Sequence, residues 1–230
     1  MRSAIAIIAS AAMVAICLSS FASPKKKAAS ASAPAPDAAE ISSIESAYHA
    51  LSDLTARFVQ DTEVAIVERT VTKKGLFRFK KGGKIRIEYD GPGGKVYVSD
   101  GSTLWVYIPG DESSTQTFLV NDETVPREAL SFMGGFGKLT KEFEISKSPE
   151  FPKAPAGATA LHLVPRAGKK HYESLDALFG PDRLLSELIV RNTSGNISRY
   201  RFTDLKRDSG LPDRLFTLSS GKATPDTLPR

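Results

Sequence analysis

The chain has 230 residues, a formal net charge of +5 and a single cysteine, Cys17. One cysteine cannot form an internal disulfide or a cysteine-based zinc site, so a hydrophobic core must stabilise any folded domain. The charge does not indicate a nucleic-acid partner either. Arg2 and the run Lys25–Lys27 supply four positive charges before the first acidic residue, Asp37, and removing these four leaves a net charge of +1.

The first 22 residues have the pattern of a secretory signal peptide. Arg2 precedes a mostly apolar run, Ala4 to Leu18, and the small-x-small sequence of residues 20–22 follows it, so we expect cleavage after Ala22. The run is shorter than the about 20 apolar residues that a membrane-spanning helix needs. A lipoprotein signal has a small residue before its cysteine, whereas Cys17 follows an isoleucine. We therefore expect an exported protein without a lipid anchor.

Composition divides the rest of the chain into three parts. Residues 23–39 are rich in Ala, Ser, Pro and Lys and are typical of a disordered linker. Residues 40–220 carry the periodic patterns of a folded domain, and residues 221–230 are expected to form a C-terminal tail. The domain opens with Glu40–Leu51, in which apolar residues recur three or four positions apart, so this segment is predicted to be an amphipathic helix.

Most of the domain is predicted to be β-structure. Apolar and polar residues alternate in short runs that are separated by turns rich in Gly, Pro and Asp, which favours an antiparallel all-β sheet of about ten strands. The runs with strand character are residues 54–67, 75–80, 84–90, 95–99, 103–109, 115–120, 143–148, 159–165, 171–179, 183–192, 197–206 and 214–218. Thr103–Ile108 is unusual because it is apolar at nearly every position, so both of its faces must avoid water.

A second helix is expected within the sheet sequence. Residues 125–134 follow a capping threonine, contain a proline near the first turn and end at the sequence GGFG. A sheet of about ten strands curls, and beyond about eight strands its interior is wider than its own side chains fill. We therefore expect the helices at 40–51 and 125–134 to cover the concave face as a lid or plug.

Residues with catalytic potential are sparse. His49, His162 and His171 have no metal-ligand spacing, and the chain contains no G-x-S-x-G elbow or P-loop. A pair of carboxylates such as glycosidases use is recognised by the distance between the two groups, which the sequence does not give, and no motif points to such a pair. We expect no catalytic residues, no metal site and no cofactor.

Four segments resemble a known family in order and spacing: residues 54–61 (LTARFVQD), 74–92 (KGLFRFKKGGKIRIEYDGP), 95–109 (KVYVSDGSTLWVYIP) and 174–192 (SLDALFGPDRLLSELIVRN). The chain is similar to the periplasmic lipoprotein carriers of the LolA family from about Ile44 to Leu218. The resemblance implies an unclosed antiparallel β-barrel with short helices as a lid over an apolar cavity. It also implies a periplasmic chaperone, expected to be a monomer, that receives the acyl chains of outer-membrane lipoproteins from an inner-membrane ABC transporter. The carrier would pass them to the outer-membrane receptor LolB or an equivalent.

The resemblance and the strand patterns together suggest the residues of a lipid site. The apolar faces of the predicted strands and of the second helix are expected to contribute Phe58, Phe77, Phe79, Ile85, Ile87, Tyr89, Trp105, Phe118, Leu130, Phe132 and Met133. The face on which Trp105 lies is left open, because its neighbours Leu104 and Val106 are also apolar and could line the concave face in its place. The family carries an Arg-Pro step that is thought to latch the lid; here Lys81 and Gly82 stand at those positions. Lys81 is therefore either a weaker latch or an ordinary turn residue, and in the second case Arg78 or Arg86 could hold the lid instead.

Two other functions remain open. A related half-barrel could act as a LolB-like lipoprotein receptor or as an envelope lipid or stress sensor. The mass of the mature N-terminus separates these readings, since a free Ser23 fits the carrier and a diacylated Cys17 fits a receptor. A secreted hydrolase would instead need a polar cleft with convergent acidic residues.

Overall fold

The computed structural model describes residues 36–120, 139–166 and 172–218, all within one compact unit, Ala33–Arg230. These residues form a single eleven-stranded sheet with the strand order β6-β5-β4-β3-β2-β1-β11-β10-β9-β8-β7. Every neighbouring pair is antiparallel, and β6 and β7 form the two free edges. The prediction of a mainly β, unclosed antiparallel barrel is confirmed.

The strands are β1 (Asp53–Val64), β2 (Arg69–Lys80), β3 (Lys84–Tyr89), β4 (Val96–Ser99), β5 (Thr103–Ile108), β6 (Asp111–Leu119), β7 (Phe143–Lys147), β8 (Thr159–Pro165), β9 (Tyr172–Phe179), β10 (Leu185–Asn192) and β11 (Ile197–Arg207). The described helices are α1 (Ala38–Ala50) and α3 (Leu139–Glu142), and the 3-10 helices are η1 (Ala65–Val67) and η2 (Asp213–Phe216). The helix predicted at 125–134 lies outside the described residues.

Most strand boundaries differ from the sequence prediction by one to four residues: β1 ends at Val64 because residues 65–67 form η1, and β6 begins at Asp111 and not at 115. Two differences are larger. The strand expected over 75–80 begins six residues earlier, at Arg69, because the polar segment before Gly75 pairs with the second half of β1. These residues are exposed, so no apolar alternation marked them as a strand. The strand expected at 214–218 was also wrong, since residues 213–216 form η2.

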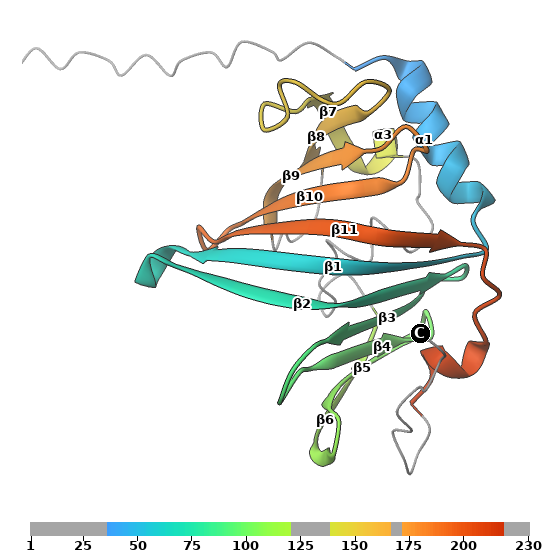
Figure 1. Ribbon diagram of the computed structural model, residues 1–230, viewed down its shortest axis with the longest axis vertical. Coiled ribbons are helices and arrows are strands. Elements are labelled where there is room, and N and C mark those ends of the chain that lie inside the picture. Colours follow the sequence, from blue (N-terminus) through green and yellow to red (C-terminus); the bar gives the residue numbers. More distant parts are fainter. Residues whose placement is uncertain (1–35, 121–138, 167–171, 219–230) are drawn as a thin grey trace, which may run out of the picture. The chain divides into compact units, whose positions relative to one another are not determined.

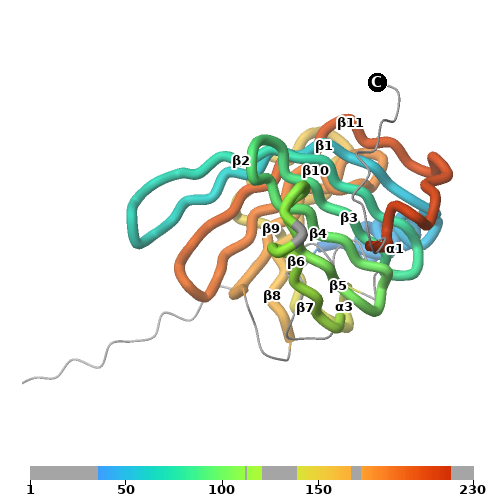
Figure 2. Tube along the Cα trace, turned by 90° about the horizontal axis from the view of Figure 1, so that it is seen from below, coloured from blue at the N-terminus to red at the C-terminus, as the bar shows by residue number. Residues whose placement is uncertain are grey.

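The sheet is strongly curved, and its first and last strands lie side by side. β1 pairs with β11, and we call this pairing the central seam. The strands from β1 to β6 extend to one side of the seam and those from β11 to β7 to the other (Figure 1). Seen from below, both edges bend toward the same side of that seam (Figure 2). The sheet therefore has an inner face, which carries the main hydrophobic cluster, and an outer face.

Helix α1 covers one end of the curved sheet. It begins at an N-cap, Asp37, whose side chain accepts a hydrogen bond from the backbone N–H of Ala39 at 2.9 Å. Its apolar stripe of Ile41, Ile44 and Tyr48 is buried in the cluster on the inner face of the sheet. The opposite end of the sheet is formed by the β1–β2 hairpin, which extends away from α1 (Figure 1, Figure 2).

Candidate functional site

The inner face is apolar where β2 and β3 pair. Phe77 lies opposite Ile87 and Phe79 opposite Ile85, so all four side chains project from the same face of the hairpin. Six of the predicted lining residues belong to or pack against the main hydrophobic cluster: Phe58, Phe77, Phe79, Ile85, Ile87 and Tyr89. Ile87 and Tyr89 are only partly buried, so an apolar ligand can reach this part of the face.

The strand register extends this face to the free edge at β6. Ile87 pairs with Tyr97, Tyr97 pairs with Val106, and Leu104 pairs with Phe118. Tyr97, Val106 and Phe118 are half-buried on the same face. The side of the sheet running from β3 to β6 therefore presents a row of accessible apolar groups.

Trp105 lies on the other face, which corrects the prediction that it borders the concave side. It pairs with Val98, and Val98 also pairs with Arg86, a residue of the outer face. Val96, Val98 and Tyr107 form a separate buried cluster against which Trp105 and Leu218 pack. Both faces of β5 are apolar because one belongs to the inner face and the other packs in this outer-face cluster, to which the C-terminal segment, residues 208–218, contributes Leu218.

Polar contacts hold this C-terminal segment on the sheet. The carboxylate of Asp53, which is buried, accepts hydrogen bonds from the backbone N–H groups of residues 209–211 at 2.8, 2.9 and 3.2 Å. Asp213 forms ion pairs with Lys80 at 2.6 Å and Lys84 at 3.0 Å. The hydrogen bond from Lys80, followed by that from Lys84, lowers the pKa of Asp213 below its usual value.

Aromatic rings form a belt across the middle of the inner face. The ring of Phe58 meets Tyr89 edge to face, with centroids 5.3 Å apart, and Tyr89 meets Tyr97 at 6.1 Å. On the other side of the seam, Tyr200 and Phe202 stack at 6.5 Å, and Tyr200 lies 6.4 Å from Phe58. The belt therefore joins strands from both halves of the sheet.

Helix α1 is attached at its middle and at its C-terminus. In the middle of the helix, Glu45 accepts a hydrogen bond from the backbone N–H of Leu139 at 2.6 Å. At its C-terminus, Lys81 in the β2–β3 turn donates from Nζ to the carbonyl of His49 at 3.3 Å. Between them the buried hydroxyl of Tyr48 accepts the backbone N–H of Leu185 at 2.9 Å.

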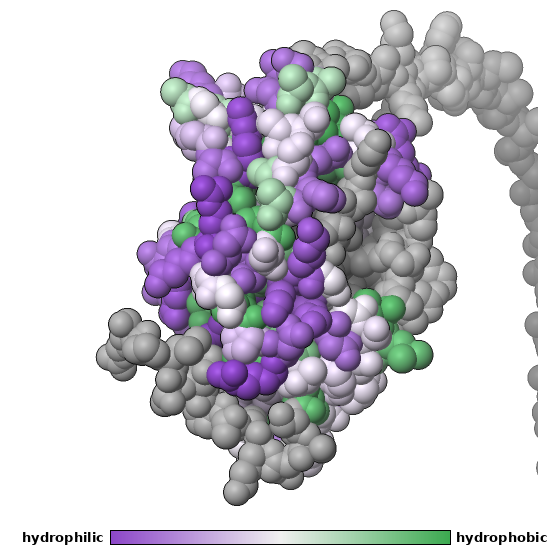
Figure 3. All heavy atoms as spheres, turned by 90° about the vertical axis from the view of Figure 1, so that its right-hand side faces the viewer, coloured by the Kyte–Doolittle hydropathy of each residue, from purple (hydrophilic) through white to green (hydrophobic). Residues whose placement is uncertain are grey.

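The exposed surface at this end of the molecule is mostly hydrophilic, as Figure 3 shows. Helix α1 thus places its apolar stripe inward, over the sheet, and its polar side toward solvent. Leu130, Phe132 and Met133, which were also expected in the site, lie outside the described residues.

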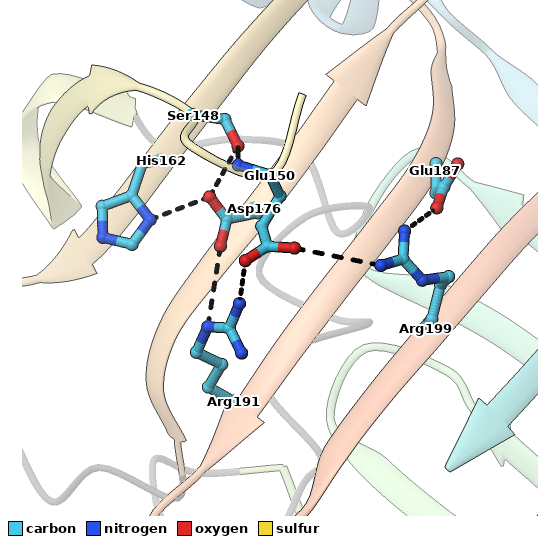
Figure 4. A network of polar contacts seen from close by, with 7 residues as sticks. All are labelled: Ser148, Glu150, His162, Asp176, Glu187, Arg191 and Arg199. Carbon is cyan, nitrogen blue, oxygen red and sulfur yellow. Dashed lines mark hydrogen bonds and ion pairs between the residues drawn. The ribbon is translucent and has the colours of Figure 1, made fainter. Parts of the chain in front are cut away.

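A separate polar network lies on the outer face (Figure 4). It consists of Ser148, Glu150, His162, Asp176, Glu187, Arg191 and Arg199. Ser148 donates to Oδ1 of Asp176 at 2.7 Å, and Nδ1 of His162 lies 2.9 Å from the same oxygen. The serine hydroxyl therefore donates its hydrogen bond to the carboxylate and not to the imidazole. In a catalytic triad, by contrast, the hydroxyl of the nucleophile donates to the histidine. The network attaches the loop after β7 to the sheet.

A family model described as outer membrane lipoprotein carrier protein LolA matches residues 49–219. The chain belongs to the LolA family. An outer-membrane lipoprotein carrier protein of Coxiella burnetii (strain CbuK_Q154) is 29% identical over 143 residues, which are 62% of this chain and 64% of that protein. The chain thus aligns with less than two thirds of that relative's length. A carrier of the same name from Pseudomonas aeruginosa (strain UCBPP-PA14) is 24% identical over 185 residues, covering 80% of this chain and 86% of the relative.

The solved structures of similar fold include a LolA superfamily protein from Nitrosomonas europaea. It is 12% identical, with a TM-score of 0.46, and the match covers 78% of this chain and 96% of that one. No helix among the described residues is long and apolar enough to cross a membrane. Within the same residues, no three His, Cys, Asp or Glu side chains are grouped to hold a metal ion.

The sequence reading of the LolA-family site missed several inner-face residues. Tyr97, Val106, Tyr200 and Phe202 all lie on the inner face, next to residues that were predicted. Tyr200 and Phe202 alternate with arginines in residues 199–202, so period-two alternation alone could have found them. Val106 could not be assigned in this way, because its strand is apolar on both faces.

Proposed function

We propose that this LolA-family protein is a non-catalytic periplasmic carrier that shelters the acyl chains of outer-membrane lipoproteins on the inner face of its open barrel. The observation that carries the proposal is the row of half-buried apolar side chains, Ile87, Tyr97, Val106 and Phe118, beside a fully buried core. Side chains in a finished core are normally close to fully buried, whereas these leave accessible apolar area inside a curved sheet.

Burial of acyl chains on this face provides ample binding energy. Each buried CH₂ contributes about 0.8 kcal/mol, so a chain of ordinary length needs only apolar lining and no polar anchor. The lining would consist of the inner-face residues from β1 to β6, without Trp105. Release is then the harder step, and α1 serves as the lid whose closure competes with the ligand for the apolar face.

The contact of Lys81 with the carbonyl of His49 supports its role as a latch on this lid. The ammonium also lies at the C-terminus of α1, where a positive charge is favourable. In the proposed cycle, an inner-membrane ABC transporter loads the opened carrier, and closure of the lid delivers the lipoprotein to LolB or an equivalent receptor at the outer membrane.

The proposal also gives each part of the chain a role. Residues 1–22 would be removed as a signal peptide on export, residues 23–39 would form a tether, residues 40–220 the carrier domain and residues 221–230 a tail. The mature protein would act as a monomer in the periplasm.

Native mass spectrometry of the protein purified from periplasm tests the proposal. We expect a fraction of the molecules to carry an acylated protein or its fragments. Phe118→Asp, on the inner face of β6, should lower the bound fraction at least tenfold, because it places a charge on the apolar face. The matched control is Thr117→Asp, whose side chain is exposed on the outer face of the same strand and should leave binding unchanged. A parent protein without acylated cargo that also fails to bind a synthetic lipopeptide would refute the carrier function.

A further inference from the structure

The inner face changes character along β1. Near α1 its side chains are apolar and buried, as at Leu54 and Phe58, which are 2% and 4% exposed. The next two inward positions, Gln60 and Thr62, are polar and half-buried. Because side chains on one face of a strand recur every second residue, the inner face turns from apolar to polar toward the β1–β2 hairpin.

Hydrogen bonds join the polar side chains into a row. The hydroxyl of Tyr89 donates to Oε1 of Gln60 at 2.8 Å, and Nε2 of Gln60 donates to Oγ1 of Thr62 at 3.0 Å. Oγ1 of Thr62 lies 3.0 Å from Oγ of Ser198 on β11. The row starts in the aromatic belt, at Tyr89, and crosses three strands. We call Gln60, Thr62, Ser198 and the neighbouring Lys73 the polar row.

Lys73 adds a positive charge to this row. Lys73 is on β2 and pairs with Gln60 on β1, so both side chains belong to the inner face. Its Nζ lies 5.5 Å from the centroid of the Tyr89 ring. Among the described residues, no carboxylate lies within ion-pair distance of Lys73. By contrast, Arg57 and Arg201 on the outer face are paired with Asp90 and Asp61.

The order of groups along the inner face matches an acylated ligand. Aliphatic side chains come first, then the aromatic belt, then hydrogen-bonding side chains and a cation, which is the order met on leaving the hydrocarbon region of a membrane. A lipoprotein terminus has the same sequence of chemistry: acyl chains, then ester and amide carbonyls, then peptide. The carbonyls need donors, which Lys73, the second amide hydrogen of Gln60 and the one hydroxyl of the Thr62–Ser198 pair that does not donate to the other can supply.

We infer that the polar row binds the ester and amide carbonyls at the head of the acylated ligand. The acyl chains lie toward α1, and the peptide leaves at the end of the sheet formed by the β1–β2 hairpin. This inference rests on the proposed carrier function and adds to it a fixed orientation of the cargo.

Lys73→Leu tests the contact with the head. The side chain is exposed, so its replacement should not disturb folding. We expect about fivefold to tenfold weaker binding of a neutral synthetic diacylglyceryl lipopeptide, because a hydrogen bond from a charged donor is lost. Binding of a fluorescent alkane probe without carbonyls should be unchanged. The control is Lys74→Leu, one residue along the same strand, which pairs with Val59 and faces outward; it should bind both ligands as the parent does.

Photocrosslinking tests the orientation. A lipopeptide with a diazirine next to its modified cysteine should label the polar row, and one with a diazirine at the acyl terminus should label residues beneath α1. Reversed labelling, or lipopeptide binding that Lys73→Leu leaves unchanged, overturns the inference while the carrier function stands. An effect of Lys73→Leu on phosphatidylglycerol but not on the lipopeptide also overturns it, since the cation would then serve a phosphate. Failure of the parent to bind any lipopeptide removes the carrier function and the inference with it.

Discussion

If α1 is the lid of the proposed carrier, replacement of Lys81 by leucine should make it easier to open. The bond from Nζ to the carbonyl of His49 is 3.3 Å long and exposed, so it is weaker than a typical bond of about 2.9 Å and contributes about 0.5 kcal/mol. The positive charge at the C-terminus of α1 adds about 0.5 kcal/mol. The total of about 1 kcal/mol corresponds to an approximately fivefold shift of the lid equilibrium toward the open state. The bond from the Lys81 backbone N–H to the carbonyl of Ser52, 2.9 Å long, is unaffected.

Two measurements follow this shift. Hydrogen exchange of the amides in α1 should quicken about fivefold, and a transfer assay should show normal loading but slower delivery to the receptor, because less closing energy opposes the cargo. Lys81→Arg keeps the charge and should deliver at least as fast as the parent. Lys95→Leu, at an exposed position of the β3–β4 turn, is the control for loss of a surface charge. If Lys81→Leu matches the parent in both exchange and delivery, Lys81 is an ordinary turn residue and the latch lies elsewhere.

Three further substitutions test the structure around the site. Tyr48→Phe leaves the buried N–H of Leu185 unpaired and should cost about 1–2 kcal/mol, measurable as a lower denaturant midpoint and faster exchange in α1; an unchanged midpoint would contradict this. Gly75→Ala places a Cβ 2.2 Å from the carbonyl oxygen of Glu88 and should lower the free energy of unfolding by about 3 kcal/mol, which a Tm equal to the parent's would disprove. Burial raises the pKa of Glu88, but the hydrogen bonds and charges of Arg86 and Arg78 lower it by more. The pKa of Glu88 therefore lies below its usual value. Its stabilisation is therefore complete above about pH 4.5 and is lost as the pH falls through the folded-state pKa. Glu88→Gln should cost about 2 kcal/mol at pH 7, and its difference from the parent should shrink toward pH 3; a constant difference would argue against the ion pair.

The positions of most strands, and the apolar face of most of them, follow from the sequence alone. In β2 and β3, charged residues alternate strictly with Phe77, Phe79, Ile85 and Ile87, and only one pleat orientation keeps those charges off the apolar inner face. Helix α1 was equally clear, since its apolar residues recur with the helical period. For Lys81 the family resemblance only raised a latch as one of the possible roles, because a turn residue carries no periodicity of its own; the contact with the carbonyl of His49 is known from the structure.

Other features depended on contacts between distant parts of the chain. Trp105 lies on the outer face, in a cluster to which Leu218, 113 residues later in the chain, also belongs, and a strand that is apolar on both faces does not show which side meets which partner. The first part of β2, from Arg69, is polar and forms a strand only because β1 supplies its hydrogen-bonding partners. The polar row likewise arises from three strands, with Ser198 136 residues from Thr62. Local pattern determines which side of a strand avoids water, whereas the identity of the neighbour that covers it is decided only when the sheet has assembled.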